Sequence, residues 1–334
     1  MSILVTGGTG YIGSHTVVDL LLRNEDIVII DNFSNSTPDM LDKIKTLGKK
    51  DFKFYQGDMT HMETLENIFK KEKIDEVIHF AALKAVGESV AKPCKYYQNN
   101  LISTLNLVSL MQKYGVNKIV FSSSACVYEK TETLPIKEDS PLSTTNPYGA
   151  SKLMVEQILK DIAFSDKNLS VAILRYFNPI GAHESGLIGE NPNGIPNNLM
   201  PYIAKVGEGI LPELSIFGDD YDTHDGTGVR DYIHVCDLAD GHIKAIEWLR
   251  KNNAFECFNL GTGIGYSVLD IVKAYEKVSG KKIPYKITPR RQGDIGEYYG
   301  DPTKANKILG YKATRDLDQM CKDSNHFSEC EAKR

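Results

Sequence analysis

The chain has 334 residues, near the upper size for one hydrophobic core and more typical of two. Charged residues make up 25% and hydrophobic residues 41%, the balance of a soluble globular protein. With 39 basic and 44 acidic side chains the net charge is −5, so composition supplies no general reason to bind nucleic acid or an anionic membrane, and we expect neither as a partner.

Three features of the chain predict a cytoplasmic location. The strand-like segment Ser2–Val5 begins directly after Met1, so we expect no signal peptide. No apolar run approaches the ~18–20 residues that a membrane span requires. The six cysteines are scattered through a large chain, which suits reduced thiols better than a disulfide framework.

Short apolar runs alternate with helical patterns in the first half of the chain. The runs predicted as strands are Ile3–Thr6, Ile27–Asp31, Phe52–Gln56, Glu76–Phe80, Ile119–Ser123 and Val171–Arg175. The predicted helices are Ile12–Arg23, Pro38–Leu47, Met62–Lys71, Cys94–Tyr114 and Pro147–Ala163. Several strands are apolar on both faces, as parallel strands covered by helices are. The alternation predicts an α/β fold with a doubly wound parallel sheet.

The pattern changes after Arg175. Residues 178–228 are rich in Pro, Gly and Asn, and a partial alternation returns with Asp231–His234, Leu238–Arg250, Cys257–Leu260 and Val268–Val278. We predict a first domain over residues 1–177, with segments near 229–262 returning to it, and a smaller, interleaved C-terminal α/β domain over residues 178–334. We expect a ligand in the cleft between them, and a loosely held tail over the last dozen residues.

A glycine-rich turn, Thr6–Gly13, follows the first predicted strand and opens a helix. Gly7, Gly10 and Gly13 let the chain turn sharply and bring the backbone against a pyrophosphate, while the helix N-terminus offers free N–H groups to it. A glycine-rich turn without a ligand is the alternative. The position between strand and helix favours a dinucleotide site.

Asp31 ends the second predicted strand, 18 residues beyond Gly13. A carboxylate there accepts hydrogen bonds from the adenosine ribose hydroxyls and repels a 2′-phosphate, so we predict NAD rather than NADP. Asn32, Asn35 and Ser36 follow with further polar groups. Asp58 follows the third strand and either reaches the adenine amino group or caps the next helix.

Tyr148 and Lys152 stand four residues apart, on one face of a predicted helix. Asn146-Pro147 reads as an N-cap followed by proline in the first helical position, so Tyr148 lies in the first turn. The helix dipole, Lys152 and an oxidised nicotinamide would each lower the pKa of the phenol toward that of a general base. Ser124, at the end of the fifth strand, is predicted to join this group; a surface Tyr–Lys pair is the alternative.

These motifs resemble the extended short-chain dehydrogenase/reductase superfamily, which has a Rossmann sheet. Longer segments are similar to the UDP-glucose 4-epimerase (UDP-galactose 4-epimerase) family within it. They are Phe80–Ser89, Tyr148–Gln157, Arg175–Pro179, Gly194–Tyr202, Asp225–His234 and Pro289–Asp294. The resemblance runs from about residue 2 to about residue 318.

The resemblance implies site residues one by one. Those implied to bind NAD are Gly7, Gly10, Tyr11, Ile12, Gly13, Asp31, Asn32, Asn35, Ser36, Asp58, Met59, Phe80, Ala81, Lys84, Asn99, Ser122, Tyr148 and Lys152. Those implied to bind the UDP-sugar are Lys84, Ser124, Tyr148, Asn178, Asn197, Asn198, Leu199, Phe217, Arg230, Arg291, Asp294 and Tyr298. Ser124, Tyr148 and Lys152 are implied to be catalytic, and arginines suit a diphosphate because they present forked donors.

The implied activity is an isomerase of galactose metabolism. It interconverts UDP-galactose and UDP-glucose by reversible oxidation at sugar carbon 4, through a 4-keto intermediate, with NAD held as a cofactor. Related dehydratases and decarboxylases carry an extra acid at the positions of Ala125 and Cys126, and neither residue supplies one. Another NAD-dependent UDP-sugar epimerase, or a non-catalytic NAD sensor of the same fold, is the alternative. Bulky Tyr298 is implied to exclude N-acetylated sugars.

Assembly and metal content complete the expectations. In relatives, helices corresponding to Cys94–Tyr114 and Pro147–Ala163 commonly build a dimer through a four-helix contact, so we expect a homodimer. We expect no metal. The acidic loop at Asp220–Asp225 lacks the glycine of a calcium loop, and Cys321, His326 and Cys330 offer no evident fourth zinc ligand.

Overall fold

The computed structural model describes residues 1–131, 133–192, 194, 196–291 and 294–333. Ile195, Gln292 and Gly293 belong to two of the segments that resemble the epimerases, and they lie outside the described residues.

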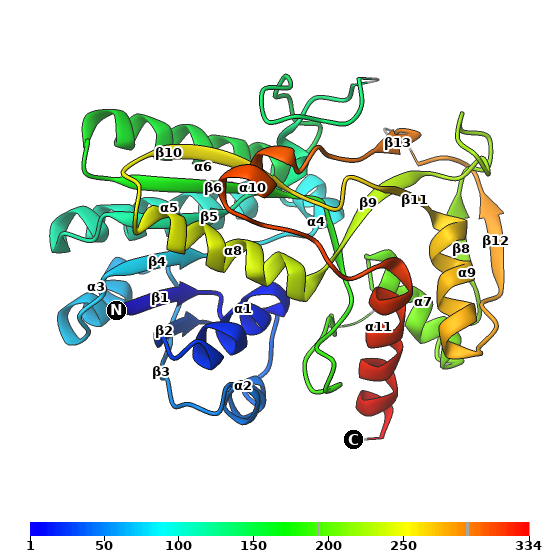
Figure 1. The fold of residues 1–334 in the computed structure, drawn as a ribbon, viewed down its shortest axis with the longest axis horizontal. Helices are drawn as coiled ribbons and strands as arrows, with labels where there is room; N and C mark the ends of the chain where they lie inside the picture. Colours follow the sequence, from blue (N-terminus) through cyan, green and yellow to red (C-terminus); the bar gives the residue numbers. More distant parts are fainter. Residues whose placement is uncertain (132, 193, 195, 292–293, 334) are drawn as a thin grey trace.

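A parallel sheet of seven strands forms the larger part of the molecule (Figure 1). Its strands in chain order are β1 (Ser2–Thr6), β2 (Asp26–Asp31), β3 (Lys53–Gln56), β4 (Glu76–His79), β5 (Lys118–Ser122), β6 (Ser170–Tyr176) and β10 (Phe255–Leu260). Their order across the sheet is β10-β6-β5-β4-β1-β2-β3. The chain winds outward from β1 and then crosses to β4 on its other side, so the strand order reverses between these two strands. The predicted doubly wound sheet is confirmed, and its reversal point is where such sheets bind ligands.

Helices cover both faces of this sheet, as alternating side chains of the strands require. Helices α1 (Tyr11–Leu22), α2 (Met40–Gly48) and α8 (Val235–Leu249) pack on one face, where Ile3, Val5, Ile27 and Ile29 point. Helices α3 (Met62–Lys71), α5 (Pro93–Tyr114) and α6 (Pro147–Ser165) pack on the other, where Leu4, Val28 and Ile30 point. Each of these strands therefore contributes side chains to two cores, which explains its continuous apolar run.

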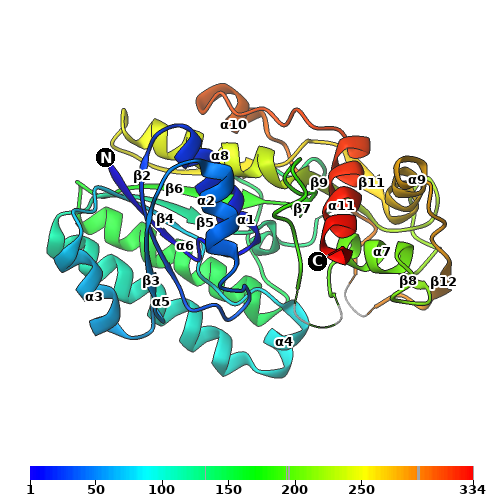
Figure 2. The ribbon, with the colours of Figure 1, turned by 90° about the horizontal axis from the view of Figure 1, so that it is seen from below.

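A smaller part lies beside the carboxyl edge of the large sheet (Figures 1 and 2). Strand β9 (Val229–His234) pairs with β7 (Asn178–Ile180), β11 (Gly265–Ser267) and β13 (Glu297–Tyr298), and β8 (Leu214–Phe217) pairs with β12 (Tyr285–Thr288). Helices α7 (Leu199–Gly207), α9 (Val268–Ser279) and α11 (Leu317–Ala332) enclose a separate core with these strands. The predicted smaller α/β part is confirmed.

Some short helical elements were not predicted from the sequence. The short helix α4 (Val86–Ala91) packs against α6, and the single turn η1 (Ala125–Val127) follows β5. Helix α10 (Thr303–Ile308) packs beside β10, so the chain returns to the large sheet late. Among the described residues, no helix combines the length and the apolar character that crossing a bilayer requires.

The prediction of a loosely held tail is wrong. Residues 317–332 form α11, which packs on α9 and α7 and buries Met320 and Cys321 completely. Asp316 caps the helix by accepting a hydrogen bond from the N–H of Gln319 at 2.9 Å. The polar composition of the segment concealed the helix, because several of its polar groups are buried against partners far away in the chain.

Candidate active site

The glycine turn between β1 and α1 is compact because two of its glycines leave no room for a side chain. Gly7 has φ +69°, and a Cβ there would come within 2.9 Å of the Ala81 nitrogen. A Cβ at Gly13 would lie 2.2 Å from the Gly7 oxygen. Gly10 is the N-cap of α1 and brings no capping side chain, so the first N–H groups of the helix are available to an anion.

Asp31 lies beside this turn at the end of β2. Its Oδ2 accepts a hydrogen bond from the Thr9 N–H at 3.1 Å, and its Oδ1 accepts one from the Phe33 N–H at 2.9 Å. Ser36 reaches the same turn, with its Oγ 2.7 Å from Thr9 Oγ1. Asn32 donates to Asp58 at 3.2 Å. These contacts place a carboxylate where the ribose of a dinucleotide would lie.

One cavity lies at the reversal point of the sheet, and the chemistry of its lining residues can be compared with that of NAD. Among its lining residues are all eighteen predicted to bind the cofactor, from Gly7 at the turn to Tyr148 and Lys152 at the far end. The glycine turn suits a pyrophosphate, Asp31 suits ribose hydroxyls, and Met59 and Ala81 offer apolar contact to a base. The donor set of the described residues therefore fits NAD.

The same cavity has lining residues that were not predicted. They are Ile30, Ser34, Gly57, Ala82, Leu83, Ser103 and Tyr176. Five of them are next to a predicted residue in the sequence, and this proximity could have identified them: Ile30, Ser34, Gly57, Ala82 and Leu83. Ser103 follows Asn99 by one helical turn of α5, which was a usable signal of shared helical face.

Tyr148 and Lys152 reach the cavity from the start of α6. Asn146 caps this helix, its Oδ1 accepting the Gly149 N–H at 2.9 Å, and Pro147 takes the first position, as the sequence predicts. Lys152 Nζ donates to the Ser122 carbonyl at 2.7 Å. Ser124 is buried just after β5, where its Oγ accepts the Cys126 N–H at 3.2 Å. The helix and the strand end thus bring the predicted catalytic residues together.

The pKa values of this group differ from the expectation. Burial raises the pKa of Tyr148 well above the usual value of a phenol, with Tyr176 and Cys126 acting in the same direction and contact with Ser124 opposing them. Burial also lowers the pKa of Lys152 to about 7, although Glu156 opposes it. In the chain itself desolvation has the larger effect, and the predicted lowering of the tyrosine pKa with NAD bound stays a prediction.

The predicted UDP-sugar residues gather on the strands of the smaller part. Arg230 of β9 and Tyr298 of β13 are register partners, and Arg230 donates to the Gly296 carbonyl at 3.2 Å. The Arg291 guanidinium lies 4.7 Å from the centre of the Phe217 ring and is paired with Asp294 at 2.8 Å. Arg230 on β9 and Arg291 between β12 and β13 thus lie near aromatic and polar groups of the smaller part.

Tyr298 connects these strands to the catalytic group. Its hydroxyl donates to the Ala125 carbonyl at 2.6 Å, and its ring lies 5.8 Å from that of Phe177. Since Ala125 follows Ser124 directly, the phenol side chain of Tyr298 reaches the residue next to the predicted catalytic serine.

The remaining predicted residues do not line the cofactor cavity, except Lys84. Asn178 begins β7 and is exposed, as are Asn197 and Asn198, while Leu199 begins α7. Asn198 donates to Glu190 at 2.7 Å, and Lys84 forms an ion pair with the same carboxylate at 3.2 Å. Glu190 was not predicted, and it connects a residue of the cofactor cavity to one of the proposed sugar-nucleotide residues.

A carboxylate and imidazole cluster outside the cavity was also not predicted as a group. The ligand atoms of His224, Asp225 and Asp270 lie within 4.8 Å of one another. Asp225 already accepts hydrogen bonds from Thr227 and Ser267, and Asp270 completes the cap of α9 by accepting the Ser267 N–H at 2.9 Å. These hydrogen bonds explain the cluster, because they stabilise the N-terminus of α9.

Comparisons with known proteins agree with this geometry. A family model described as GDP-mannose 4,6 dehydratase matches residues 4–324. The chain is 59% identical to a UDP-glucose 4-epimerase of Bacillus subtilis (strain 168), over 97% of this chain and 96% of that protein.

Two solved structures are similar to the whole chain. A UDP-glucose 4-epimerase from Bifidobacterium longum, in complex with NAD+ and UDP, has a TM-score of 0.96 and 52% identity, and the match covers 99% of each chain. A UDP-glucose-4-epimerase from Stenotrophomonas maltophila, with bound NAD and formylated UDP-arabinopyranose, has a TM-score of 0.98 and 45% identity, covering 100% of this chain and 99% of that one.

Proposed function

The chain belongs to the family of the UDP-glucose 4-epimerases, and from that premise we propose that it interconverts UDP-glucose and UDP-galactose while NAD stays bound. One observation carries the proposal: the predicted cofactor residues line one cavity, and Tyr148 and Lys152 are among them. Bound NAD supplies a reversible acceptor for the electrons taken from sugar carbon 4, so the reaction has no net redox change.

Tyr148 is the proposed proton carrier. It removes the proton of the sugar 4-hydroxyl as that carbon is oxidised and returns a proton to the 4-keto oxygen as the carbon is reduced. Because burial holds the phenol neutral in the chain itself, positive charge beside it is needed to stabilise the phenolate. We propose that Lys152 supplies part of that charge and that Ser124 orients the sugar hydroxyl.

The strands of the smaller part are proposed to hold the UDP end. Arg230 and Arg291 would face the diphosphate, and Asp294 the uridine ribose, because these side chains match charged and hydroxyl partners respectively. The Arg291 guanidinium lies over the Phe217 ring, and this supports the proposal that Phe217 contacts the uridine base. Anchoring the UDP end leaves the sugar free to turn and to present its other face.

Residues beside Ser124 favour epimerisation over elimination. The family model carries a dehydratase name, but a dehydratase needs an additional acid or base beside the oxidised sugar. Ala125 offers none, and its carbonyl is occupied by Tyr298. Cys126 carries a thiol there and no carboxyl group.

The experiment is to mix the pure protein, without added NAD, with UDP-galactose and to measure UDP-glucose. Product formation is expected, since the cofactor leaves the protein neither as a substrate nor as a product. Absence of turnover, with or without added NAD, would contradict the proposal. Bound NAD without turnover would indicate a sensor.

We also propose the arrangement of the chain around this reaction. Residues 1–177 with segments near 229–262 would hold NAD, and the rest of 178–334 would hold the UDP-sugar. Support comes from β10, which lies beside β6 in the large sheet, and from α8, which packs against α1. Strand β9 is the exception in that range, because it lies in the smaller sheet and carries Arg230, which is proposed to bind the UDP-sugar.

A homodimer and a cytoplasmic location complete the proposal. Exposed apolar side chains on α5 and α6, namely Ile102, Leu105 and Met154, support a contact between copies through these helices. All six cysteines are free, which supports a reducing compartment.

A further inference from the structure

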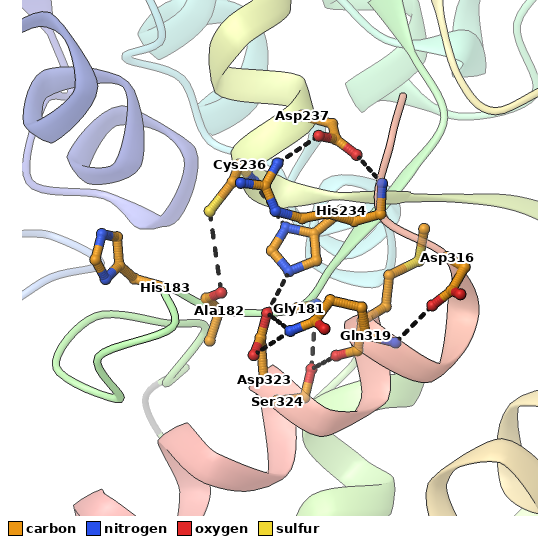
Figure 3. A network of polar contacts seen from close by, with 12 residues as sticks. Gly181, Ala182, His183, His234, Cys236, Asp237, Asp316, Gln319, Asp323 and Ser324 are labelled. Atoms are coloured by element: carbon orange, nitrogen blue, oxygen red, sulfur yellow. Dashed lines mark hydrogen bonds and ion pairs between the residues drawn. The ribbon is translucent and has the colours of Figure 1, made fainter. Parts of the chain in front are cut away.

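Two adjacent side chains fasten the C-terminal helix α11 to the strands beside the site (Figure 3). Asp323 accepts a hydrogen bond from His234 Nε2 at 3.1 Å, and both side chains are buried, with 8% and 1% exposed. His234 Nδ1 accepts the Cys236 N–H at 3.1 Å, so the hydrogen of the neutral ring lies on Nε2. Gln319 donates to both oxygens of Asp323 at 2.8 Å.

The second side chain, Ser324, is joined to the glycine turn through one intervening residue. Its Oγ accepts the Gly181 N–H at 3.1 Å and donates to the Met320 carbonyl at 2.9 Å. The Gly181 carbonyl in turn accepts the Tyr11 hydroxyl at 2.7 Å. A chain of hydrogen bonds therefore runs from α11 to the first residue of α1.

Gly181 is held in place by its own geometry as well. Its φ is +93°, and a Cβ there would lie 2.8 Å from the ring of His234. The imidazole that Asp323 orients is therefore the surface against which Gly181 packs. Asp323 and Ser324 thus act on the same residue from two sides.

These contacts lead to both proposed ligand sites, although α11 itself supplies none of the residues lining the NAD cavity among those described. Tyr11 lies in that cavity. His234 ends β9, the strand of Arg230, and is the register partner of Ile180 on β7, the strand of Asn178. A shift of α11 would move a side chain of each site.

We propose that Asp323 and Ser324 are positioning residues for this reaction: through His234 and Gly181 they hold Tyr11 at the NAD site and β9 at the UDP-sugar site. The inference rests on the proposed function. It assigns to the C-terminal helix control of how tightly NAD is kept, by side chains that touch neither ligand.

The first test is a double-mutant cycle on the full-length protein with Ser324→Ala and Tyr11→Phe. Release of bound NAD is followed with a coupled dehydrogenase that captures free NAD. Each single variant is expected to release NAD about tenfold faster, since each loses one buried hydrogen bond. Because both act through Gly181, the double variant should release it no faster than the faster single variant. Rates that multiply in the double variant would overturn the proposal.

The second test separates positioning from stability. Asp323→Asn keeps the size of the side chain and weakens its bond to His234. It is expected to speed NAD release and raise the KM for UDP-galactose about tenfold, with kcat within about threefold. Asp318→Asn, on the same helix in an ion pair with Lys277 that is 45% and 70% exposed, should change neither.

The outcomes distinguish this inference from the proposed function. A lower melting temperature for Asp323→Asn, with NAD release and KM unchanged well below that temperature, would overturn the positioning role alone. A wild-type protein that holds no NAD and does not turn over UDP-galactose would overturn the proposed function.

Discussion

At the predicted site, burial shifts the pKa values of Tyr148 and Lys152 more than neighbouring charges do. Tyr148 and Lys152 both have pKa values shifted toward their neutral forms, because the cavity removes water from them. The proposed acid–base chemistry therefore needs positive charge beside the phenol.

Tyr148→Phe tests the proton carrier. Loss of the hydroxyl should lower kcat by about 10³-fold, because acid–base catalysis by one group contributes on this order. The Kd for UDP should change less than about threefold, since the residues proposed to hold UDP lie on other elements. Turnover assays and calorimetric titration measure the two quantities; unchanged kcat would contradict the assignment.

Tyr298→Ser tests the size limit for the sugar. The wild-type protein should turn over UDP-N-acetylglucosamine far more slowly than UDP-glucose, because the Tyr298 side chain reaches the residue next to Ser124. The smaller side chain should raise the rate with the acetylated sugar about tenfold relative to the plain one. The ratio of kcat/KM values for the two sugars is the measurement, and equal ratios in both proteins would argue against this role.

His79 at the end of β4 makes stability depend on pH. Burial lowers its pKa to about 3, with Lys152 acting in the same direction, while its ring contacts Thr6 and Thr104 at 2.7 and 3.0 Å. Below the unfolded pKa of ~6.5, only the unfolded chain binds the proton, so the free energy of unfolding falls as pH falls toward 3.

Urea unfolding between pH 5 and 6, with NAD in excess, measures this effect. His79→Gln should reduce the pH slope by about 1.4 kcal/mol per pH unit, the contribution of one proton. The exposed His61→Gln is the control and should leave the slope as it is. A slope that is the same in His79→Gln and wild type would refute the role of His79.

At the scale of elements, α6 is joined to β6 by a buried ion pair. Arg175 NH2 lies 2.6 Å from Glu156 Oε2, and the two side chains are 6% and 5% exposed. Glu156 also accepts a hydrogen bond from Ser123, next to Ser124, which is proposed to be catalytic. The pair thus fixes the helix of Tyr148 relative to the strand ends.

Glu156→Gln leaves the Arg175 charge buried without a counter-charge. The free energy of unfolding should fall by about 3 kcal/mol. Glu256→Gln is the matched control, because Glu256 on the neighbouring β10 pairs with Lys304 where both are partly exposed, and its loss should stay below about 1 kcal/mol. Equal losses in the two variants, measured by urea unfolding, would show that burial does not set the difference.

At the scale of the whole molecule, a larger and a smaller part share one chain that crosses between them repeatedly. The large sheet carries the proposed NAD cavity. The smaller part lies beside the carboxyl edge of that sheet (Figure 1), and its strands β9 and β13 carry Arg230 and Tyr298. The proposed sites for the two ligands therefore involve parts that a division by length alone would separate.

Leu105→Glu tests the proposed homodimer. Leu105 is 44% exposed on α5, beside Ile102, and a charge in an apolar contact is costly to bury. Sedimentation should give twice the 37.2 kDa of one chain for the wild type and one chain for the variant. Ile264→Glu, exposed on the smaller part, should remain dimeric. A wild type that sediments as a single chain would disprove the dimer.

Much of this protein was predictable from local order along the chain. The alternation of apolar strands and amphipathic helices determined the large sheet, because each face of a buried strand needs its own layer of helices. The glycine turn, Asp31 and the pair Tyr148 and Lys152 lie at strand ends and helix starts, so predicting those elements also placed these residues at one edge.

Only the tertiary structure decided the smaller sheet and the C-terminal helix. Strands of two or three residues, such as β13 and β11, show no periodicity of their own and exist through pairing with β9. In α11, Asp323 and Ser324 look like surface residues in the sequence, yet they are buried against His234 and Gly181, 89 and 143 residues away. A polar group can be buried only where its partner is, and a partner that distant leaves no trace in the local pattern.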